Sequence, residues 1–166
     1  MLKEKQILNK SQIEQKIRRM AYEIYEQNHE LKDIILVGVA ENGLKISSML
    51  KKEIESISSI KVHVAKLSVE KDAPVQPQVE FSEFPKIEQF TMVLVDDVMN
   101  SGRTMIYALD PFLKMGAKKI QTAVLVNRSH KRFPISVDYK GFELATTIQE
   151  HIQVSLTDSD FSAYLY

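Results

Sequence analysis

Three strand-length runs rich in aliphatic residues constrain the fold of this chain more than any other feature of its sequence. They span residues 34–40, 92–98 and 120–126. Strands that lack a regular alternation of polar and apolar residues are those covered on both faces, as in a parallel sheet between helices. The three runs therefore predict neighbouring strands of a central, mainly parallel sheet flanked by helices.

Segments with helical periodicity alternate with these runs. Residues 11–28 begin with Ser11 and Glu14, which have the spacing of a capping box, and continue as one apolar stripe. Residues 44–54 follow the first run and residues 103–115 follow the second. An alternation of strand and helix is typical of α/β folds with right-handed parallel crossovers.

The remaining sequence predicts further strands at residues 61–69, 137–144 and 152–156. The long connection at 70–88 holds three of the five prolines, and long loops in compact domains are usually functional or disordered. No repeat or linker interrupts the chain, so we expect one domain over residues 1–166. Because ligands of such sheets bind beyond the carboxyl ends of the strands, the site is expected after the three aliphatic runs.

The composition excludes several kinds of site. Lys plus Arg number 22 and Asp plus Glu number 22, so no net charge draws the whole chain to nucleic acid or to a membrane, although a local basic patch stays open. The chain has no cysteine, which excludes disulfides, thiolate metal sites and a cysteine nucleophile. Its first ten residues lack the apolar core of a signal peptide, and no apolar run approaches the ~18 residues of a membrane span. We expect a cytoplasmic protein without a membrane partner.

The stretch from Asp96 to Thr104 carries the chemistry. An apolar strand delivers Asp96 and Asp97 to its carboxyl end, and a turn through Ser101 and Gly102 opens the next helix. Free amides at a helix N-terminus attract an anion, and the hydroxyls of Ser101 and Thr104 can add donors. A phosphate would repel the two carboxylates, so they are expected to face ribose hydroxyls or a bound Mg²⁺. An ordinary turn is the alternative, but two acids directly after a buried strand favour a sugar-phosphate site.

Residues 93–104 resemble the phosphoribosyl diphosphate (PRPP) motif of type I phosphoribosyltransferases. The resemblance implies that family's α/β fold with a flexible hood, and it implies that Asp96 and Asp97 bind the ribose of PRPP. It assigns the 5′-phosphate to Asn100, Ser101, Gly102, Arg103 and Thr104. Further stretches at 17–24, 35–39 and 123–130 are similar, in the same order, to the branch that combines regulation of a pyrimidine operon with uracil phosphoribosyltransferase activity.

The sequence departs from that family where pyrophosphate is bound. The family's loop after the first strand usually carries Thr-Arg-Gly, whereas this chain has Glu41, Asn42 and Gly43. Without the arginine, a bidentate phosphate partner is lost. Glu41 adds repulsion toward a diphosphate, about 1 kcal/mol at 4 Å in water and about 4 kcal/mol at an effective dielectric of 20. Asn42 can still donate through its amide, and Lys45 is a further candidate cation.

The hood and the base pocket differ as well. Where relatives of this branch carry Tyr-Arg-Asp-Asp, the chain retains one base and one acid, Lys71 and Asp72. Lys71 either covers the pyrophosphate as a point charge or belongs to a solvated loop, and both interpretations stay open. The family binds its nucleobase after the third aliphatic run, where Asn127 replaces an Asp and Arg128 is retained. The resemblance therefore places both side chains near the base.

An RNA partner is weakly indicated by two basic clusters in regions that this branch uses for RNA. The clusters consist of Arg18 and Arg19, and of His130, Lys131 and Arg132. Tyr22 and Ser136 stand where a His and an Arg would be expected. A basic patch gives salt-dependent affinity for a nucleic-acid backbone without reading its sequence, so two solvated clusters are an equal alternative.

Two functions follow from these features. The first is transfer of ribose 5-phosphate from PRPP to a pyrimidine base, with uracil favoured and pyrophosphate released. In this reaction Mg²⁺ is bound with PRPP and takes no ligand from the protein directly. The second is a catalytically weak regulator that binds a nucleoside monophosphate and RNA or a protein partner. The resemblance also suggests a homodimer.

Overall fold

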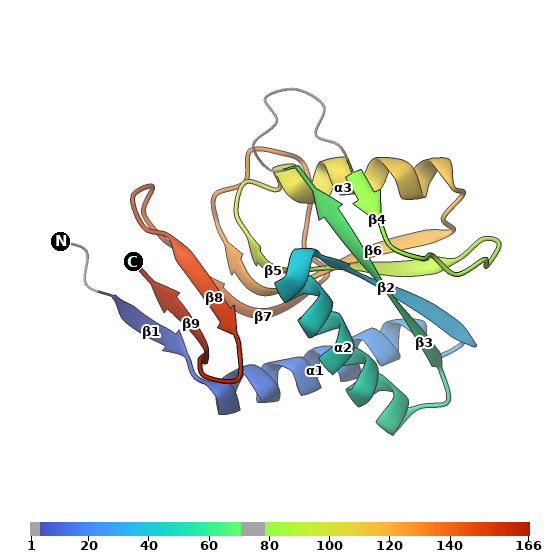
Figure 1. Ribbon diagram of the computed structural model, residues 1–166, viewed down its shortest axis with the longest axis horizontal. Coiled ribbons are helices and arrows are strands. Elements are labelled where there is room, and N and C mark those ends of the chain that lie inside the picture. Colours follow the sequence, from blue (N-terminus) through green and yellow to red (C-terminus); the bar gives the residue numbers. More distant parts are fainter. Residues whose placement is uncertain (1–3, 71–78) are drawn as a thin grey trace.

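A six-stranded sheet forms the centre of the computed structural model, which describes residues 4–70 and 79–166 (Figure 1). Its strands are β2 (Asp33–Val39), β3 (Lys61–Val69), β4 (Val79–Phe81), β5 (Thr91–Met99), β6 (Lys119–Arg128) and β7 (Tyr139–Leu144). Their spatial order is β4-β3-β2-β5-β6-β7. All neighbours in this sheet are parallel except β4, which pairs antiparallel with β3 at one edge. The mainly parallel sheet predicted from the sequence is thus confirmed.

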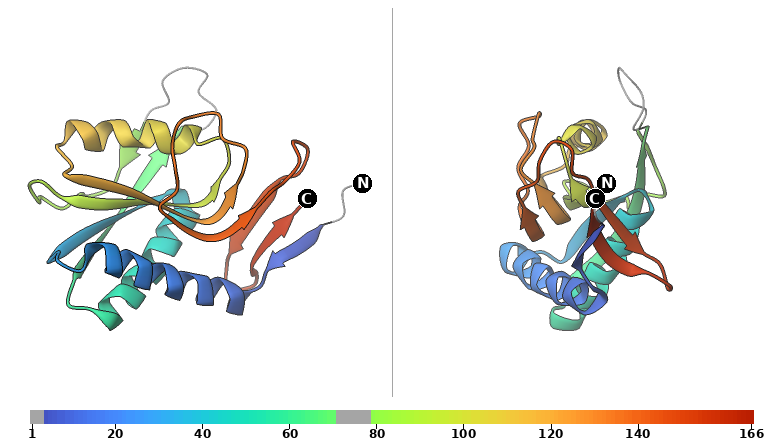
Figure 2. Two further views of the ribbon diagram at one scale, coloured as in Figure 1. Left: turned by 180° about the vertical axis from the view of Figure 1, so that it is seen from behind. Right: turned by 90° about the vertical axis from the view of Figure 1, so that its left-hand side faces the viewer.

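Helices cover both faces of this sheet, as Figures 1 and 2 show. They are α1 (Lys10–Asn28) and α2 (Ala40–Ile57) on one face and α3 (Arg103–Lys114) on the other. The residues of β2 show why this strand lacks polar alternation. Ile34 and Leu36 pack in the cluster under α1 and α2, whereas Ile35 and Val37 pack in the cluster under α3. All four side chains are fully buried, so both faces of the strand need apolar residues.

A second, three-stranded antiparallel sheet lies at one end of the molecule, beside the start of α1 (Figure 1). Its strands are β1 (Lys5–Leu8), β8 (Ile152–Leu156) and β9 (Phe161–Leu165), in the spatial order β1-β9-β8. The sheet brings the two ends of the described chain together. Its buried residues Leu8, Val154, Leu156 and Ala163 belong to the same cluster as the core under α1 and α2. The sequence predicted β8 but neither β1 nor β9.

Two predicted helix starts were wrong. The capping box of α1 consists of Asn9 and Gln12 instead of Ser11 and Glu14: Gln12 N–H donates to Asn9 Oδ1 and Asn9 N–H donates to Gln12 Oε1, both at 2.9 Å. Asn is as good an N-cap as Ser, and it stands nearer the end of β1. The second helix begins at Ala40 instead of residue 44, directly after β2.

Candidate active site

The N-terminus of α3 forms a cradle at the carboxyl end of β5. Gly102 caps the helix with φ +85°, a left-handed conformation that glycine adopts without steric cost. The backbone of Ser101 is held by the chain that follows β6, because Arg132 N–H and Phe133 N–H both donate to its carbonyl oxygen, at 2.9 and 3.2 Å. A pocket of about 260 Å³ opens here, and the described residues that line it are residues 96–105. The structure therefore brings together all the residues that the sequence assigned to ribose and 5′-phosphate.

The two acids at the end of β5 are fixed by their own backbone. Asp96 is buried with 6% of its surface exposed, and its Oδ1 accepts from Asp97 N–H at 2.8 Å. Asp97 Oδ1 accepts from Val98 N–H at 2.8 Å, while its Oδ2 accepts from the Asn42 side chain at 2.8 Å. Carboxylates held in this way present a defined arrangement of acceptors to a polyhydroxyl ligand without having to be ordered on binding.

The predicted pyrophosphate loop is the first turn of α2, so it is helical rather than a loop. Asn42 uses both amide hydrogens internally: besides Asp97, its Nδ2 donates to the carbonyl oxygen of Val154 in β8 at 2.9 Å. Gly43 lies against β5, where an added Cβ would be 2.5 Å from the Val95 carbonyl oxygen. Glycine is therefore required here by the close approach of the helix to the sheet.

Glu41 of the same turn points outward and forms an ion pair with Lys66 of β3. The hydrogen bond from Lys66, together with its positive charge, holds the pKa of the Glu41 carboxyl below its usual value of 4.5. Lys45, one turn further along α2, donates from Nζ to the Leu156 carbonyl oxygen at 2.7 Å. The negative charge that Glu41 brings to this end of the sheet is thus balanced by a cation that the sequence analysis did not consider.

Arg128 lies at the carboxyl end of β6 and links the cradle to the segment that follows β7. It is buried with 7% exposure, and its guanidinium donates to Asn100 Oδ1 at 2.8 Å, to Thr146 Oγ1 at 2.9 Å and to the Glu150 carbonyl oxygen at 2.7 Å. Asn127 is also buried, and its amide donates weakly to Glu143 at 3.4 Å. Within the described residues, its Oδ1 has no hydrogen-bond partner. Both predicted base-pocket residues are therefore at the expected edge of the sheet, but Arg128 acts there as a structural anchor.

Sequence reasoning missed Lys66, Thr146 and Glu150. Lys66 is 25 residues from Glu41, and Arg128 is 22 residues from Glu150. None of the three belongs to a local pattern. A weak signal existed only for Lys66, a charged residue between the buried Ala65 and Leu67 near the end of β3. The predicted hood residues Lys71 and Asp72 lie outside the described residues.

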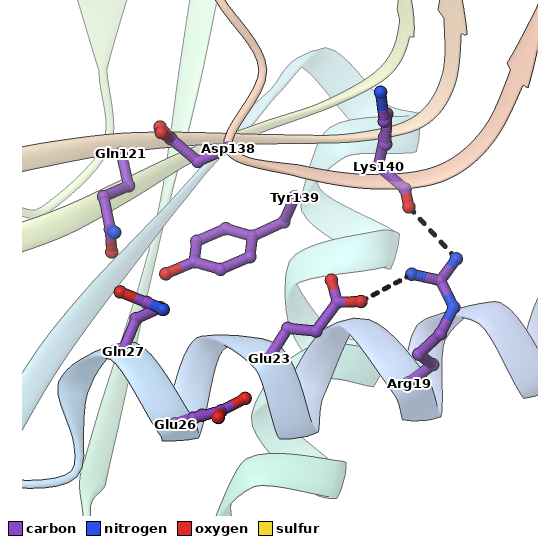
Figure 3. A pocket seen from close by; sticks show the side chains of 8 residues that line it. All are labelled: Arg19, Glu23, Glu26, Gln27, Gln121, Asp138, Tyr139 and Lys140. Atoms are coloured by element: carbon purple, nitrogen blue, oxygen red, sulfur yellow. Dashed lines mark hydrogen bonds and ion pairs between the residues drawn. The ribbon is translucent and has the colours of Figure 1, made fainter.

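The two basic clusters do not form one patch of unpaired cations. Arg18 pairs with Glu53 at 3.5 Å, and Arg19 pairs with Glu23 at 2.8 Å while donating to the carbonyl oxygens of Lys140 and Gly141. Figure 3 shows Arg19 with its contacts to Glu23 and Lys140, in a pocket of about 390 Å³ between α1 and the starts of β6 and β7. Asp138, Glu23 and Glu26 also line that pocket, so the surface around Arg19 has mixed charge.

The second cluster lies on the other side of the molecule, beside the cradle. His130 hydrogen bonds through Nε2 to the Thr146 carbonyl oxygen, and the backbone of Arg132 holds Ser101. His130 and Arg132 therefore help to hold the segments around the site in place, in addition to carrying charge.

Neither a membrane span nor a preformed metal centre was found in the described ranges. None of the described helices is long and apolar enough to cross a membrane. Among residues 4–70 and 79–166, no three His, Cys, Asp or Glu side chains gather to hold a metal ion.

Comparisons with known proteins agree with this geometry. The model of the phosphoribosyl transferase domain matches residues 3–159. The chain is 34% identical to a bifunctional protein PyrR of Clostridioides difficile over 96% of this chain and 95% of the relative. It is 36% identical to that of Haemophilus ducreyi over 91% of this chain and 89% of the relative.

Solved structures show the same fold at low sequence identity. A hypoxanthine-guanine phosphoribosyltransferase of Bacillus anthracis superposes with a TM-score of 0.71, 17% identity, and coverage of 84% of this chain and 81% of that one. A hypoxanthine phosphoribosyltransferase of Trypanosoma cruzi gives a TM-score of 0.76 at 17% identity, covering 86% and 78%. These likenesses establish the fold, and the domain match together with the PyrR relatives establishes the family. The chain belongs to the phosphoribosyl transferase domain family and is similar to its PyrR members.

Proposed function

We propose that this protein transfers the ribose 5-phosphate group of PRPP to a pyrimidine base, with uracil as the favoured substrate, and releases pyrophosphate. The observation that carries the proposal is the pocket at residues 96–105, where two fixed carboxylates adjoin the open N-terminus of α3. This combination suits a ligand with hydroxyls at one end and a phosphate at the other. The PyrR relatives support the choice of a pyrimidine.

The arrangement of the strands supports an order of subsites. The ribose would lie on Asp96 and Asp97 at the end of β5, with its 5′-phosphate on residues 101–104. In a displacement at the anomeric carbon, the base and the leaving diphosphate lie on opposite sides of that carbon. The neighbours of β5 are β6 on one side and β2 on the other. The base would therefore approach from the side of Asn127 and Arg128, and the diphosphate would lie toward the first turn of α2.

Mg²⁺ fits this site as an ion shared with the substrate. Asp96 and Asp97 offer oxygen atoms of the kind that Mg²⁺ prefers, but the described residues hold no cluster that could bind a metal alone. Its direct ligands would come from PRPP and from water, and the two acids would face the ion without binding it directly. When bound, the ion neutralises charge on the departing diphosphate. The protein's own part is to orient the ribose and to hold the phosphate, and it needs no covalent nucleophile.

The first experiment is Mg²⁺-dependent release of pyrophosphate from PRPP, with uracil and then with a panel of other bases. Release with uracil supports the proposal as stated, and release with another base alone would correct the substrate. If no base supports release while titration shows that PRPP or a nucleotide binds, the transferase is rejected.

A catalytically weak regulator is the second candidate. It is favoured by one observation: Asn42, which stands where the family has its pyrophosphate-binding arginine, is committed to Asp97 and Val154. Such a protein would bind a nucleoside monophosphate and present the complex to RNA or to a protein partner. The variant Asn42→Arg separates the candidates, because a large gain in pyrophosphate release would indicate an enzyme that has lost activity. A homodimer and a cytoplasmic location stay predictions, which light scattering and cell fractionation would check.

A further inference from the structure

Lys66 is a cation near the carboxyl edge of the sheet that the sequence analysis did not assign to the site. It lies near the end of β3, opposite Gly38 of β2 in the parallel register. From there its Nζ reaches the Glu41 carboxylate in the first turn of α2. About a third of the Lys66 side chain and 70% of that of Glu41 are exposed, so a ligand in solution can compete for this pair.

Two lysines lie around the acid in the first turn of α2. Glu41 is the acid of that turn, and Lys66 and Lys45 both lower its pKa, Lys66 much the more directly because it also donates a hydrogen bond. Two ammonium groups therefore surround one carboxylate. The helix N-terminus adds backbone N–H groups, and its N-cap residue Val39 provides no side-chain acceptor for them.

This turn also lies beside the two carboxylates assigned to the ribose. Asn42 follows Glu41 directly and hydrogen bonds to Asp97 at 2.8 Å, so the turn that carries Glu41 is in contact with the carboxylate assigned to the ribose. Residues 40–69 contain no arginine, so the cations that this part of the chain can offer to an anion at the turn include only lysines and a histidine. Lysine suits the task because its ammonium is a mobile point charge that can change partners.

We propose that Lys66 binds the diphosphate group of PRPP and that Glu41 holds the lysine in place while the site is empty. The inference rests on the proposed transferase function. A diphosphate carries more negative charge than one carboxylate and brings Mg²⁺ with it, so Lys66 turns from Glu41 to the ligand on binding. A nucleoside monophosphate has its single phosphate in the α3 cradle and does not reach Lys66.

The test compares the affinities of two ligands by calorimetric titration with Mg²⁺ and without any base. The ligands are PRPP, which carries the diphosphate, and uridine 5′-monophosphate, which does not. We expect Lys66→Gln to weaken PRPP binding about tenfold or more and to leave the monophosphate unchanged. Lys66→Arg should retain most of the affinity. Glu41→Gln should tighten PRPP binding several-fold, because it frees the lysine and removes a repulsive charge.

Lys61→Gln is the matched control, since it removes the same side chain from the opposite end of the same strand. If wild-type protein binds PRPP and Lys66→Gln binds it equally well, the role of Lys66 is refuted and the transferase proposal stands. Equal losses for both ligands would also refute it, because they would indicate a general disturbance of the site. If the wild-type protein binds the monophosphate but not PRPP, both proposals fall together.

Discussion

Two junctions between a strand and a helix meet at the same edge of the sheet, and they differ in what they leave open. After β5, the chain turns through Gly102 at φ +85° and leaves the first turn of α3 lining a pocket. After β2, α2 begins directly with Ala40 at φ +53°, and the side chains of its first turn are bound to neighbouring elements. A strand followed by a helix thus leaves a pocket at one junction, whereas at the other the side chains of the first turn hold the helix to its neighbours.

The comparison indicates that a helix N-terminus is not sufficient to make a phosphate-binding site. Glycine, serine and threonine at the first junction add little bulk and leave the amides approachable. Glu41 and Asn42 at the second bring their own charge and hydrogen bonds, which join α2 to β3, β5 and β8. Whether the second junction also accepts an anion then depends on how easily these contacts exchange.

The largest effect is expected from Asp97→Ala, since Asp97 lies where the two junctions meet. The substitution removes an acceptor for the ribose and leaves Asn42 Nδ2 and Val98 N–H without their partner. Because hydrogen bonds to a charged group contribute about 1.5–3 kcal/mol each, nucleotide affinity should fall about a hundredfold. Titration with uridine 5′-monophosphate measures this, and an affinity within threefold of wild type would remove Asp97 from the site.

The open junction can be broken by Gly102→Ala. A Cβ at this position lies in a left-handed conformation and 2.6 Å from Ile135 Cγ2. We expect a loss of about 1–2 kcal/mol in the free energy of unfolding from the backbone alone, together with weaker phosphate binding. Gly116→Ala is the control, because its φ of +81° carries the same strain with nothing within 4 Å. Equal effects of the two variants on phosphate binding would show that the cradle does not depend on Gly102.

The junction between β2 and α2 can be loosened by Asn42→Ala. The change leaves Asp97 Oδ2 and the Val154 carbonyl oxygen without a donor, so urea unfolding should show a loss of about 1–3 kcal/mol. Hydrogen exchange in β8 should also accelerate, since the small sheet loses one of its polar links to α2. Ser48→Ala, on the exposed side of the same helix, should change neither measurement. Unchanged exchange in β8 would mean that apolar packing alone holds the small sheet.

The smallest expected effect is that of Glu41→Gln on how the free energy of unfolding depends on pH. The folded pKa of Glu41 is lowered, so the unfolded chain binds the proton more readily than the folded one. The contribution of the ion pair with Lys66 is therefore complete above pH 4.5 and is lost as the pH falls through the lower folded value. Urea midpoints measured downward from pH 6 should decline slightly less for Glu41→Gln than for the wild type. Parallel declines would show that the exposed pair adds nothing measurable, as for many surface pairs.

The local sequence determined the central sheet and the open junction. The aliphatic runs at β2, β5 and β6 can be buried on both faces only between two layers of helices, so they specify a mainly parallel sheet. Asp96 to Thr104 is one continuous segment, and its strand end, turn and helix start place the acids next to the cradle by short-range geometry alone. For that reason the residues that the sequence predicts to bind ribose and phosphate line one pocket in the fold.

Only the tertiary structure determined the contacts at the junction between β2 and α2, the pairing in the small sheet and the hydrogen-bond partners of Arg128. The partners there are remote in the chain: Asn42 meets Val154 across 112 residues, and Lys66 meets Glu41 across 25. β1 pairs with β9 although one begins and the other nearly ends the chain. Such contacts leave no periodic pattern in either partner, because they depend on where the folded core brings two segments together. The sequence by itself could therefore identify Glu41 as an unexpected charge, and only the fold could show that Lys66 balances it.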